Sequence, residues 1–347
     1  MPGEPVSATT SKRFPVLVAW GGLECWGHRG ASAAFPENTL ASFEGAIRDG
    51  VEGIESADVH MSLDDVVVMF HDPSLERTTD GHGLIREKYW YGPEGMEHVR
   101  TKKEPKQAVP TFPETIELLM KPENHHVQLN VDVKMQNEPS RLFTLLNKTI
   151  TSYESWETLL APRILLGLWH PRFLDPAKNI LPYLRRSYIG VSPYVARKYF
   201  WDSCDVFSIH FMILVSQDGA KFREEAKVAG KKILVWTVND PKHMMECVRW
   251  DVDGILTDYT KVWLDLRAEL ESEWTCLPSS RAMRCLFPGF AEDEQKVTAQ
   301  YNSRLFLWKS VFYYRPVQFL MLYLYRTWLE SVAGPLDDPA PVIKVES

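Results

Sequence analysis

Short apolar runs alternate with amphipathic stretches along residues 15–272 of the chain. The runs are continuous rather than alternately polar, which is typical of strands in a parallel sheet that is buried on both faces. The stretches between them begin with helix-start signals, for example Asn38-Thr39 and Asp240-Pro241. The pattern predicts strands at 17–20, 54–59, 127–133, 164–168, 187–191, 206–209, 233–238 and 254–257.

Eight βα units in about 250 residues favour an α/β fold of the (β/α)8 TIM barrel type, with an open doubly wound sheet as the alternative. A further apolar run at 66–70 follows the second strand too closely for a helical crossover, so a hairpin is predicted there. Residues 73–112 show no strong period and are predicted to form a small insertion over one mouth of the barrel.

The C-terminal part differs in kind from the repeat. Residues 304–333 are dense in aromatic residues and leucine, but Lys309, Arg315 and Arg326 interrupt them and Pro316 is predicted to break the helix. The longest uncharged run, 316–325, is shorter than the roughly 20 residues that span a bilayer. Two short helices are therefore expected, either as an anchor at a membrane interface or as a helix pair that closes the bottom of the barrel.

The predicted organisation is a disordered segment at 1–14, the barrel at 15–272, the helical tail at 273–334 and a disordered end at 335–347. The formal net charge is −7 and no long basic block occurs, which argues against a nucleic-acid partner. Five cysteines without a CxxC pair indicate neither a zinc site nor a disulfide framework. Because the N-terminal segment lacks an apolar signal core, an intracellular location is expected.

Ionisable side chains gather at the predicted carboxyl ends of the strands, where TIM barrels carry their chemistry. The carboxylates among them suit a hard divalent cation such as Mg²⁺ or Ca²⁺. Arg29 and Lys134 are the counter-charges that an anionic phosphate requires. The polar and ionisable residues at these predicted strand ends are His28, Arg29, Glu55, Asp58, Asp132, Lys134, His170, Ser192, His210, Asn239 and Asp258.

A series of motifs runs in order over residues 26–260. They are Gly27-His28-Arg29-Gly30, Phe35-Pro36-Glu37-Asn38-Thr39, the Glu55 and Asp58 carboxylates, His71-Asp72-Pro73, Arg77-Thr78-Thr79, Val131-Asp132-Val133-Lys134, Val235-Trp236-Thr237-Val238-Asn239 and Val252-Asp253-Gly254-Ile255-Leu256-Thr257-Asp258. Together they resemble the glycerophosphodiester phosphodiesterase family. The run 166–170 and the apolar tail are similar to the fungal branch that acts as a phosphatidylglycerol phospholipase C.

The resemblance implies a metal-dependent hydrolase that cleaves glycerophosphodiesters or phosphatidylglycerol and releases glycerol 3-phosphate. Glu55, Asp58 and Asp132 would hold one divalent cation. His28 and His71 would act as the acid and base pair. The family mechanism implies attack by the glycerol 2-hydroxyl to give a cyclic phosphate, which water then opens; a lyase-like relative would stop at the cyclic product.

The remaining roles concern the substrate. Arg29 and Lys134 would steady the phosphate oxygens, and Trp236 either packs beside the substrate or fills the barrel. Asn38 is expected to cap the first helix rather than to contact substrate. A membrane surface is the expected partner of the tail.

Two insertions depart from the family pattern. The family places its second-strand carboxylates as Glu-x-Asp, whereas here Ser56-Ala57 separates Glu55 from Asp58. The two carboxylates would then point to opposite faces of the strand unless a β-bulge absorbs Ala57. A catalytically impaired barrel that binds lipid headgroups is therefore the alternative function. The second insertion is 21–26, six residues between the predicted first strand and His28.

Overall fold

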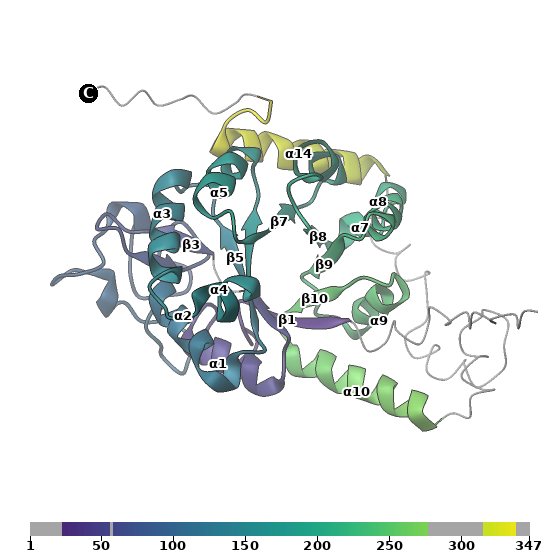
Figure 1. Cartoon of the computed structure of the whole chain (residues 1–347), viewed down its shortest axis with the longest axis horizontal. Coiled ribbons are helices and arrows are strands. Elements are labelled where there is room, and N and C mark those ends of the chain that lie inside the picture. The colour runs from purple at the N-terminus through teal and green to yellow at the C-terminus, as the bar shows by residue number, and fades with distance from the viewer. Residues whose placement is uncertain (1–22, 56–57, 277–314, 338–347) are drawn as a thin grey trace, which may run out of the picture.

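The computed structural model describes residues 23–55, 58–276 and 315–337, and these residues form a closed parallel barrel flanked by helices (Figure 1). Going round the barrel, the strands follow the order β1, β2, β5, β6, β7, β8, β9, β10 and back to β1, all parallel. The predicted TIM barrel is confirmed. Its strands are β1 Glu24–His28, β2 Gly53–Glu55, β5 Gln128–Val133, β6 Ile164–Leu168, β7 Arg185–Gly190, β8 Val206–His210, β9 Lys232–Trp236 and β10 Gly254–Thr257.

The first strand was predicted wrongly. The position between β10 and β2 is taken by β1, Glu24–His28, whereas the predicted strand at 17–20 lies outside the described residues. Residues 24–26, half of the supposed insertion at 21–26, are thus strand. Glu24 hides β1 in the sequence because it places a charged residue at the start of the strand, where its carboxylate accepts from Lys232 Nζ at 3.0 Å.

Inside the barrel, polar pairs and apolar side chains lie at different levels. Glu24 with Lys232 and Gln128 with Arg185 pair near the amino ends of the strands. Above them, the buried interior is filled by Trp26, Leu165, Val206, Leu234 and Leu256. Side chains therefore fill the barrel from the amino ends of its strands. An active site is expected at the carboxyl ends, as in other TIM barrels.

Helices cover the outside of the barrel. Several begin as their sequence predicts; for example, Asp240 Oδ1 accepts from the Lys242 amide at 2.8 Å at the start of α9. The α-helices are α1 Leu40–Asp49, α2 Phe112–Met120, α3 Pro139–Ile150, α4 Trp156–Leu159, α5 Leu174–Ile180, α6 Pro193–Val195, α7 Phe211–Leu214, α8 Gln217–Val228, α9 Pro241–Arg249, α10 Thr260–Cys276 and α14 Arg315–Ala333. Short turns of other helix types are η2 Ile85–Glu87, η3 Met96–His98, η4 Pro122–Asn124, η5 Ala161–Arg163, η6 Pro171–Phe173 and η7 Ala196–Phe200.

The second barrel strand contains one extra residue. On one side of residues 56–57, Glu55 is the partner of Asn130 on β5. On the other side, Val59 of β3 (Val59–Met61) is the partner of Val133. Four steps along this strand thus match three along β5, which is the count of a β-bulge. The bulge accounts for how Glu55 and Asp58 both face the barrel mouth.

The predicted hairpin and insertion are present. β4 (Val67–Met69) runs antiparallel to β3. The following segment, residues 70–111, has a small core of its own and reaches the mouth of the barrel, where Lys103 Nζ donates to the backbone carbonyls of Ser32, Ala33 and Phe35. That core includes Val68 of β4 together with Phe70, Leu75, Ile85, Trp90, Met96 and Val109.

Beyond α10, the described part of the tail is one helix, α14. Pro316 occupies its first turn, where the missing N–H costs no hydrogen bond, and the helix expected before Pro316 lies outside the described residues. The expectation that the tail closes the bottom of the barrel was wrong, because the end of α14 contacts His170 and Arg172, which follow β6 at the carboxyl side. Among the described residues, no helix is long and apolar enough to cross a membrane.

Candidate active site

His28, the last residue of β1, is held in one orientation by a carboxylate. Its Nδ1 donates to Asp258 Oδ1 at 2.6 Å, and Asp258 also accepts from Ser32 Oγ and Asn239 Nδ2. Although burial opposes it, hydrogen bonding from His28 lowers the pKa of Asp258 to about 2. A permanently ionised carboxylate therefore fixes the ring, and the opposite nitrogen, Nε2, faces Glu55 Oε2 at 3.7 Å.

The turn after His28 requires glycine. Gly30 has φ of +82°, and a Cβ there would stand 2.3 Å from the Ser42 hydroxyl. The same hydroxyl donates to the Arg29 carbonyl at 2.7 Å, so the turn is tied to α1. This tight packing sends the Arg29 side chain toward Asp58, with Nε 3.5 Å from Oδ2.

His71 repeats the arrangement seen at His28. Its Nδ1 donates to Asp72 Oδ1 at 2.7 Å, and its Nε2 lies 4.0 Å from Asp58 Oδ1. Arg77 bonds both Asp72 and Glu37, and Glu37 in turn accepts from Arg29 at 2.9 Å. Burial lowers the pKa of His71 against the attraction of Asp58. Two histidines thus present Nε2 to the mouth, each with Nδ1 held by a carboxylate.

The three predicted carboxylates meet beneath the histidines. Lys134 Nζ lies between Asp58 and Asp132, 2.6 Å from one and 2.9 Å from the other. Although burial acts in the opposite direction, Lys134, His71 and Arg29 lower the pKa of Asp58 well below its usual range.

The other two carboxylates are under-compensated. Burial, offset in part by the His28 ring, raises the pKa of Glu55 to about 7. Burial, offset in part by Lys134, raises the pKa of Asp132 to about 6. The carboxylates Glu55, Asp58 and Asp132 face two fixed cations, Arg29 and Lys134. The site therefore carries excess negative charge that a further cation would neutralise.

Asn38 is placed differently from the prediction. Thr39, not Asn38, caps α1, since its side chain accepts from the Ser42 amide at 3.2 Å. Asn38 adopts φ of +53° and donates to Asp58 Oδ2 at 2.9 Å. Its Oδ1 is buried and has no hydrogen-bond partner among the described residues. Asn38 is therefore a member of the site with one unused acceptor.

An aromatic wall closes one side of the mouth. Trp169 Nε1 donates to Asp132 Oδ1 at 2.6 Å, and its ring meets Trp236 edge to face with centroids 5.7 Å apart. The Trp236 ring also meets the His210 ring edge to face, with centroids 4.9 Å apart, and its Nε1 donates to the Ser208 carbonyl. Trp236 thus lies both above the buried interior cluster and in the wall of the mouth.

The oxygen atoms of the site suit a divalent cation in kind but do not surround one among the described residues. Carboxylate oxygens with raised pKa values, together with the unused Oδ1 of Asn38, are the hard ligands that Mg²⁺ and Ca²⁺ prefer. Within residues 23–55, 58–276 and 315–337, however, no group of three His, Cys, Asp or Glu side chains stands ready to share one ion. Lys134 takes up oxygens of both Asp58 and Asp132. The charge of the site fits a cation, and the side chains would have to rearrange to surround it.

Comparisons with known proteins identify the family. Residues 28–262 match the model of the glycerophosphoryl diester phosphodiesterase family, and the chain belongs to this family of enzymes. A glycerophosphodiester phosphodiesterase of Caldanaerobacter subterraneus is 26% identical over 252 residues, covering 69% of this chain and 95% of the relative. A human glycerophosphodiester phosphodiesterase is 33% identical over 135 residues, covering 38% of this chain and 39% of the relative.

Solved structures have the same fold. A phosphodiesterase of Oleispira antarctica in complex with the product sn-glycerol-3-phosphate superimposes with a TM-score of 0.57 at 23% identity, over 72% of this chain and 99% of that one. The enzyme of Thermotoga maritima gives a TM-score of 0.55 at 20% identity, over 70% and 98%. The predicted family, fold and enzyme class are thereby confirmed.

The predicted site residues lie close together, and several residues that support them were not predicted. The structure places all eight predicted site residues around one mouth: His28, His71, Arg29, Lys134, Trp236, Glu55, Asp58 and Asp132. The missed supports are Ser32, Glu37, Asp72, Arg77 and Trp169. Asn239 and Asp258 were among the predicted strand-end residues, and in the structure Asp258 bonds His28 and Asn239 bonds Asp258. Asp72 and Glu37 were visible in the motifs, but their pairing through Arg77 joins residues 40 positions apart.

Proposed function

We propose that this chain hydrolyses glycerophosphodiesters and releases sn-glycerol 3-phosphate. The observation that carries the proposal is the pair of histidines, each with Nδ1 donated to a carboxylate and Nε2 facing the mouth. Membership of the family and the product held by the Oleispira antarctica enzyme support the same substrate class.

The chemistry assigned to the histidines is proton transfer. One Nε2 accepts the proton of the glycerol 2-hydroxyl as its oxygen bonds to phosphorus, and the other gives a proton to the departing alcohol oxygen. The cyclic phosphate that results is opened by water, whose proton and hydroxyl complete glycerol 3-phosphate. Asp258 and Asp72 keep the rings oriented and stabilise each imidazolium while it exists.

The phosphate would be bound by the fixed cations and the aromatic wall. Arg29 and Lys134 lie where they can neutralise phosphate oxygens, and Trp236 lines the mouth beside them. Glu55, Asp58 and Asp132 would hold one Mg²⁺ or Ca²⁺. When bound, such an ion neutralises charge that develops on the phosphate.

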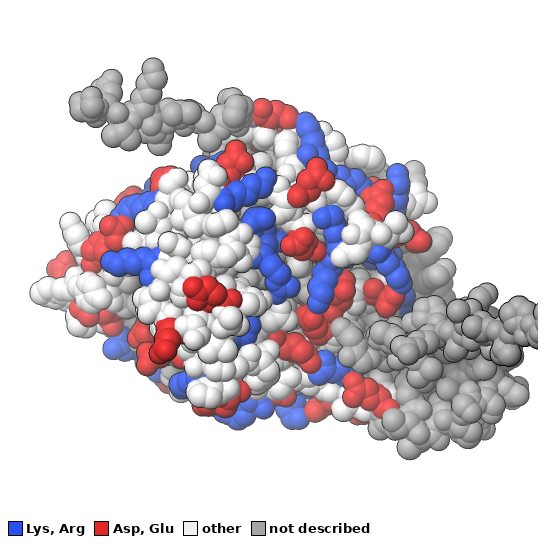
Figure 2. Space-filling model, in the orientation of Figure 1, with Lys and Arg blue, Asp and Glu red and all other residues white. Residues whose placement is uncertain are grey.

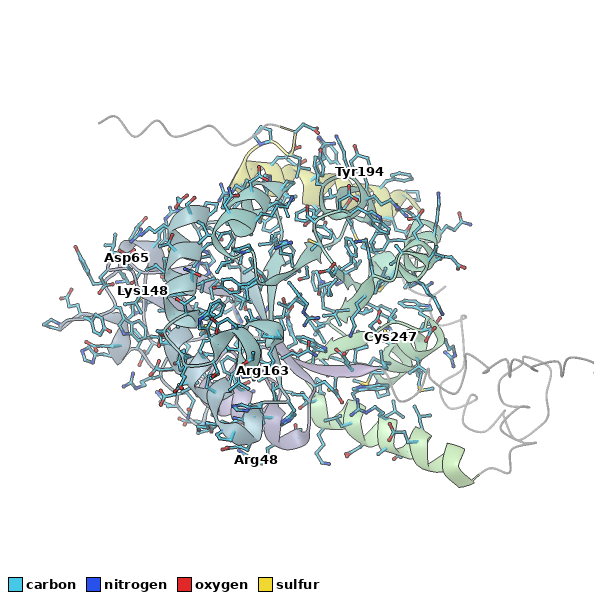
Figure 3. All side chains as sticks on the ribbon, in the orientation of Figure 1. Arg48, Asp65, Lys148, Arg163, Tyr194 and Cys247 are labelled. Carbon is cyan, nitrogen blue, oxygen red and sulfur yellow. The ribbon has the colours of Figure 1, made fainter. Side chains whose placement is uncertain are left out.

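We further propose that the substrate includes phosphatidylglycerol at an intracellular membrane surface, reached through α14. Five large side chains on this helix are exposed, and the opposite side packs on the barrel through Leu329 and Ala333. Tyr194 on α6, which lies beside α14, adds an exposed ring (Figure 3). The exposed set is Phe319, Leu320, Tyr323, Leu324 and Trp328.

The charge distribution of the chain favours binding to a membrane through a local apolar contact and not through general attraction to anionic lipid. Acidic and basic side chains are interspersed on the face shown in Figure 2, and the whole chain is acidic. Apolar side chains on one helix are the means by which such a protein would bind an interface. The predicted anchor residues at 304–314 lie outside the described residues.

A substrate panel tests both proposals. The full chain is incubated with glycerophosphodiesters in solution and with phosphatidylglycerol vesicles, and products are followed by mass spectrometry and phosphorus NMR. Release of glycerol 3-phosphate from both supports both proposals, and a persistent cyclic phosphate would indicate the lyase-like reaction. In the double variant Phe319→Ser, Tyr323→Ser we expect vesicle hydrolysis to fall at least about tenfold while the soluble substrate is unaffected. Equal loss on both substrates would contradict membrane docking through α14.

A further inference from the structure

The end of α14 contacts the loop that follows β6. Gly334 ends the helix in a left-handed conformation, with φ of +90° and its amide bonded to the Glu330 carbonyl at 3.0 Å. The carbonyl of Gly334 accepts from His170 Nε2 at 3.1 Å. The other ring nitrogen, Nδ1, accepts from the Arg172 amide at 3.2 Å, and His170 is only 2% exposed. The imidazole thus bridges the tail and its own loop with both nitrogens used.

Arg172 makes a second connection from the same loop. Its guanidinium donates to the carbonyls of Ala333, Met135 and Asn137. Met135 directly follows Lys134, the cation between the two site carboxylates. One arginine therefore joins the end of α14 to the segment that carries Lys134.

Trp169 is the residue held between these contacts and the site. It precedes His170 in the chain, donates to Asp132 at 2.6 Å and lies 5.5 Å, ring centroid to Nζ, from Lys134. Because the backbone on its C-terminal side is fixed by His170 and Arg172, the position of the indole depends on the carbonyls of Ala333 and Gly334. These carbonyls lie outside residues 28–262, the part that matches the family model.

We propose that the C-terminal end of α14 positions Trp169 and, through it, Asp132, with His170 and Arg172 as positioning residues. The tail is then a support of the catalytic mouth and not only an appended docking element. The catalytic consequence rests on the proposed phosphodiesterase function, whereas the position of the indole can be measured without any turnover.

The most direct readout is the indole N–H resonance of Trp169 in nitrogen-15 NMR, assigned by its loss in Trp169→Phe. In His170→Ala we expect this resonance to move upfield, because the bond to Asp132 lengthens. His170→Gln keeps a donor for the Gly334 carbonyl and should restore part of the shift. The matched control is His125→Ala, which removes a histidine bond to the Met120 carbonyl at 3.1 Å, remote from the mouth. An unmoved resonance in His170→Ala would overturn the proposal.

The tail side can be tested with matched glycines. Gly334 and Gly50 both end helices with φ near +100°, and a Cβ on either meets nothing within 4 Å. Gly334→Ala and Gly50→Ala should therefore lower the melting temperature by similar amounts. Only Gly334→Ala should move the Trp169 resonance. A shift of equal size in both variants would show general loosening and contradict the proposal.

A double-mutant cycle tests the path through Trp169. In the active enzyme, His170→Ala should lower kcat by about tenfold and raise the half-saturating cation concentration, since small displacements at a reacting centre are costly. In a Trp169→Phe background, the same substitution should have almost no further effect on either quantity. Fully additive losses would overturn a path through the indole. Absence of turnover in the wild-type chain would overturn the proposed function instead, and the resonance experiments would still decide the positioning role.

Discussion

The Nδ1 atom of His28 lies 2.6 Å from Oδ1 of Asp258, across the seam where β1 and β10 close the barrel. The same carboxylate accepts from Ser32 and Asn239, so its orientation is fixed from three sides. This contact joins the first strand of the barrel to the end of the last one. The motif Gly27-His28-Arg29-Gly30 therefore depends on a residue 230 positions away.

Replacing Asp258 tests this dyad. Asp258→Asn keeps the shape but removes the charge, and we expect kcat to fall by about 10-fold to 100-fold with little change in KM, because the imidazolium loses its partner. The matched control is Asp253→Asn, which removes a carboxylate that accepts from the Ile233 amide near the amino ends of the strands. Equal kinetics for wild type and Asp258→Asn would remove Asp258 from the mechanism.

Substituting the histidines separately tests the acid and base assignment. His28→Ala and His71→Ala should each lower turnover by about 10² to 10⁴-fold, the usual effect of removing a general acid or base. Their side chains are 15% and 33% exposed, so the melting temperature should change little. His60→Ala is the comparison, since His60 is buried and its Nε2 bonds the His71 carbonyl at 3.3 Å. Either catalytic variant that keeps more than about a tenth of the wild-type rate has been assigned the wrong role.

Cation binding should weaken as the pH falls. The pKa of Glu55 is raised to about 7 and that of Asp132 to about 6, so both carboxyls bind protons that a metal ion must displace. Below pH 7 the half-saturating cation concentration should rise by about tenfold per pH unit, and more steeply below pH 6. Calorimetric titration with Mg²⁺ and Ca²⁺ between pH 5.5 and 8 measures the cation affinity at each pH. Glu55→Gln should flatten the upper part of this dependence, and a wild-type affinity independent of pH would contradict the assignment of Glu55.

Deleting Ala57 tests whether the extra residue impairs the site. Pairing of Glu55 with Asn130 and of Val59 with Val133 leaves one residue unmatched, so the deletion should restore regular register with both carboxylates still facing the mouth. We expect a melting temperature at least as high as that of the wild type and undiminished turnover. If the wild type is inactive and the deletion creates both cation binding and turnover, the headgroup-binding alternative is correct for the natural chain.

The barrel could be predicted because most of its strands are continuous apolar runs, as β6 and β10 are. The first strand could not, because the charged Glu24 interrupts the apolar pattern in β1, whereas 17–20 shows that pattern more clearly. In the site, Asn38 was misassigned because a left-handed φ of +53° moves its side chain from the helix end to Asp58. Trp169 was missed as a site residue, since its bond to Asp132 depends on packing between neighbouring strands and leaves no local signal.

Release of glycerol 3-phosphate from a water-soluble glycerophosphodiester is the measurement that tests the central claim most directly. The full chain, supplied with Mg²⁺ or Ca²⁺, should release glycerol 3-phosphate and the free alcohol in equal amounts, and EDTA or His28→Ala should stop the reaction. A folded chain that releases no glycerol 3-phosphate from any glycerophosphodiester with any divalent cation would contradict it.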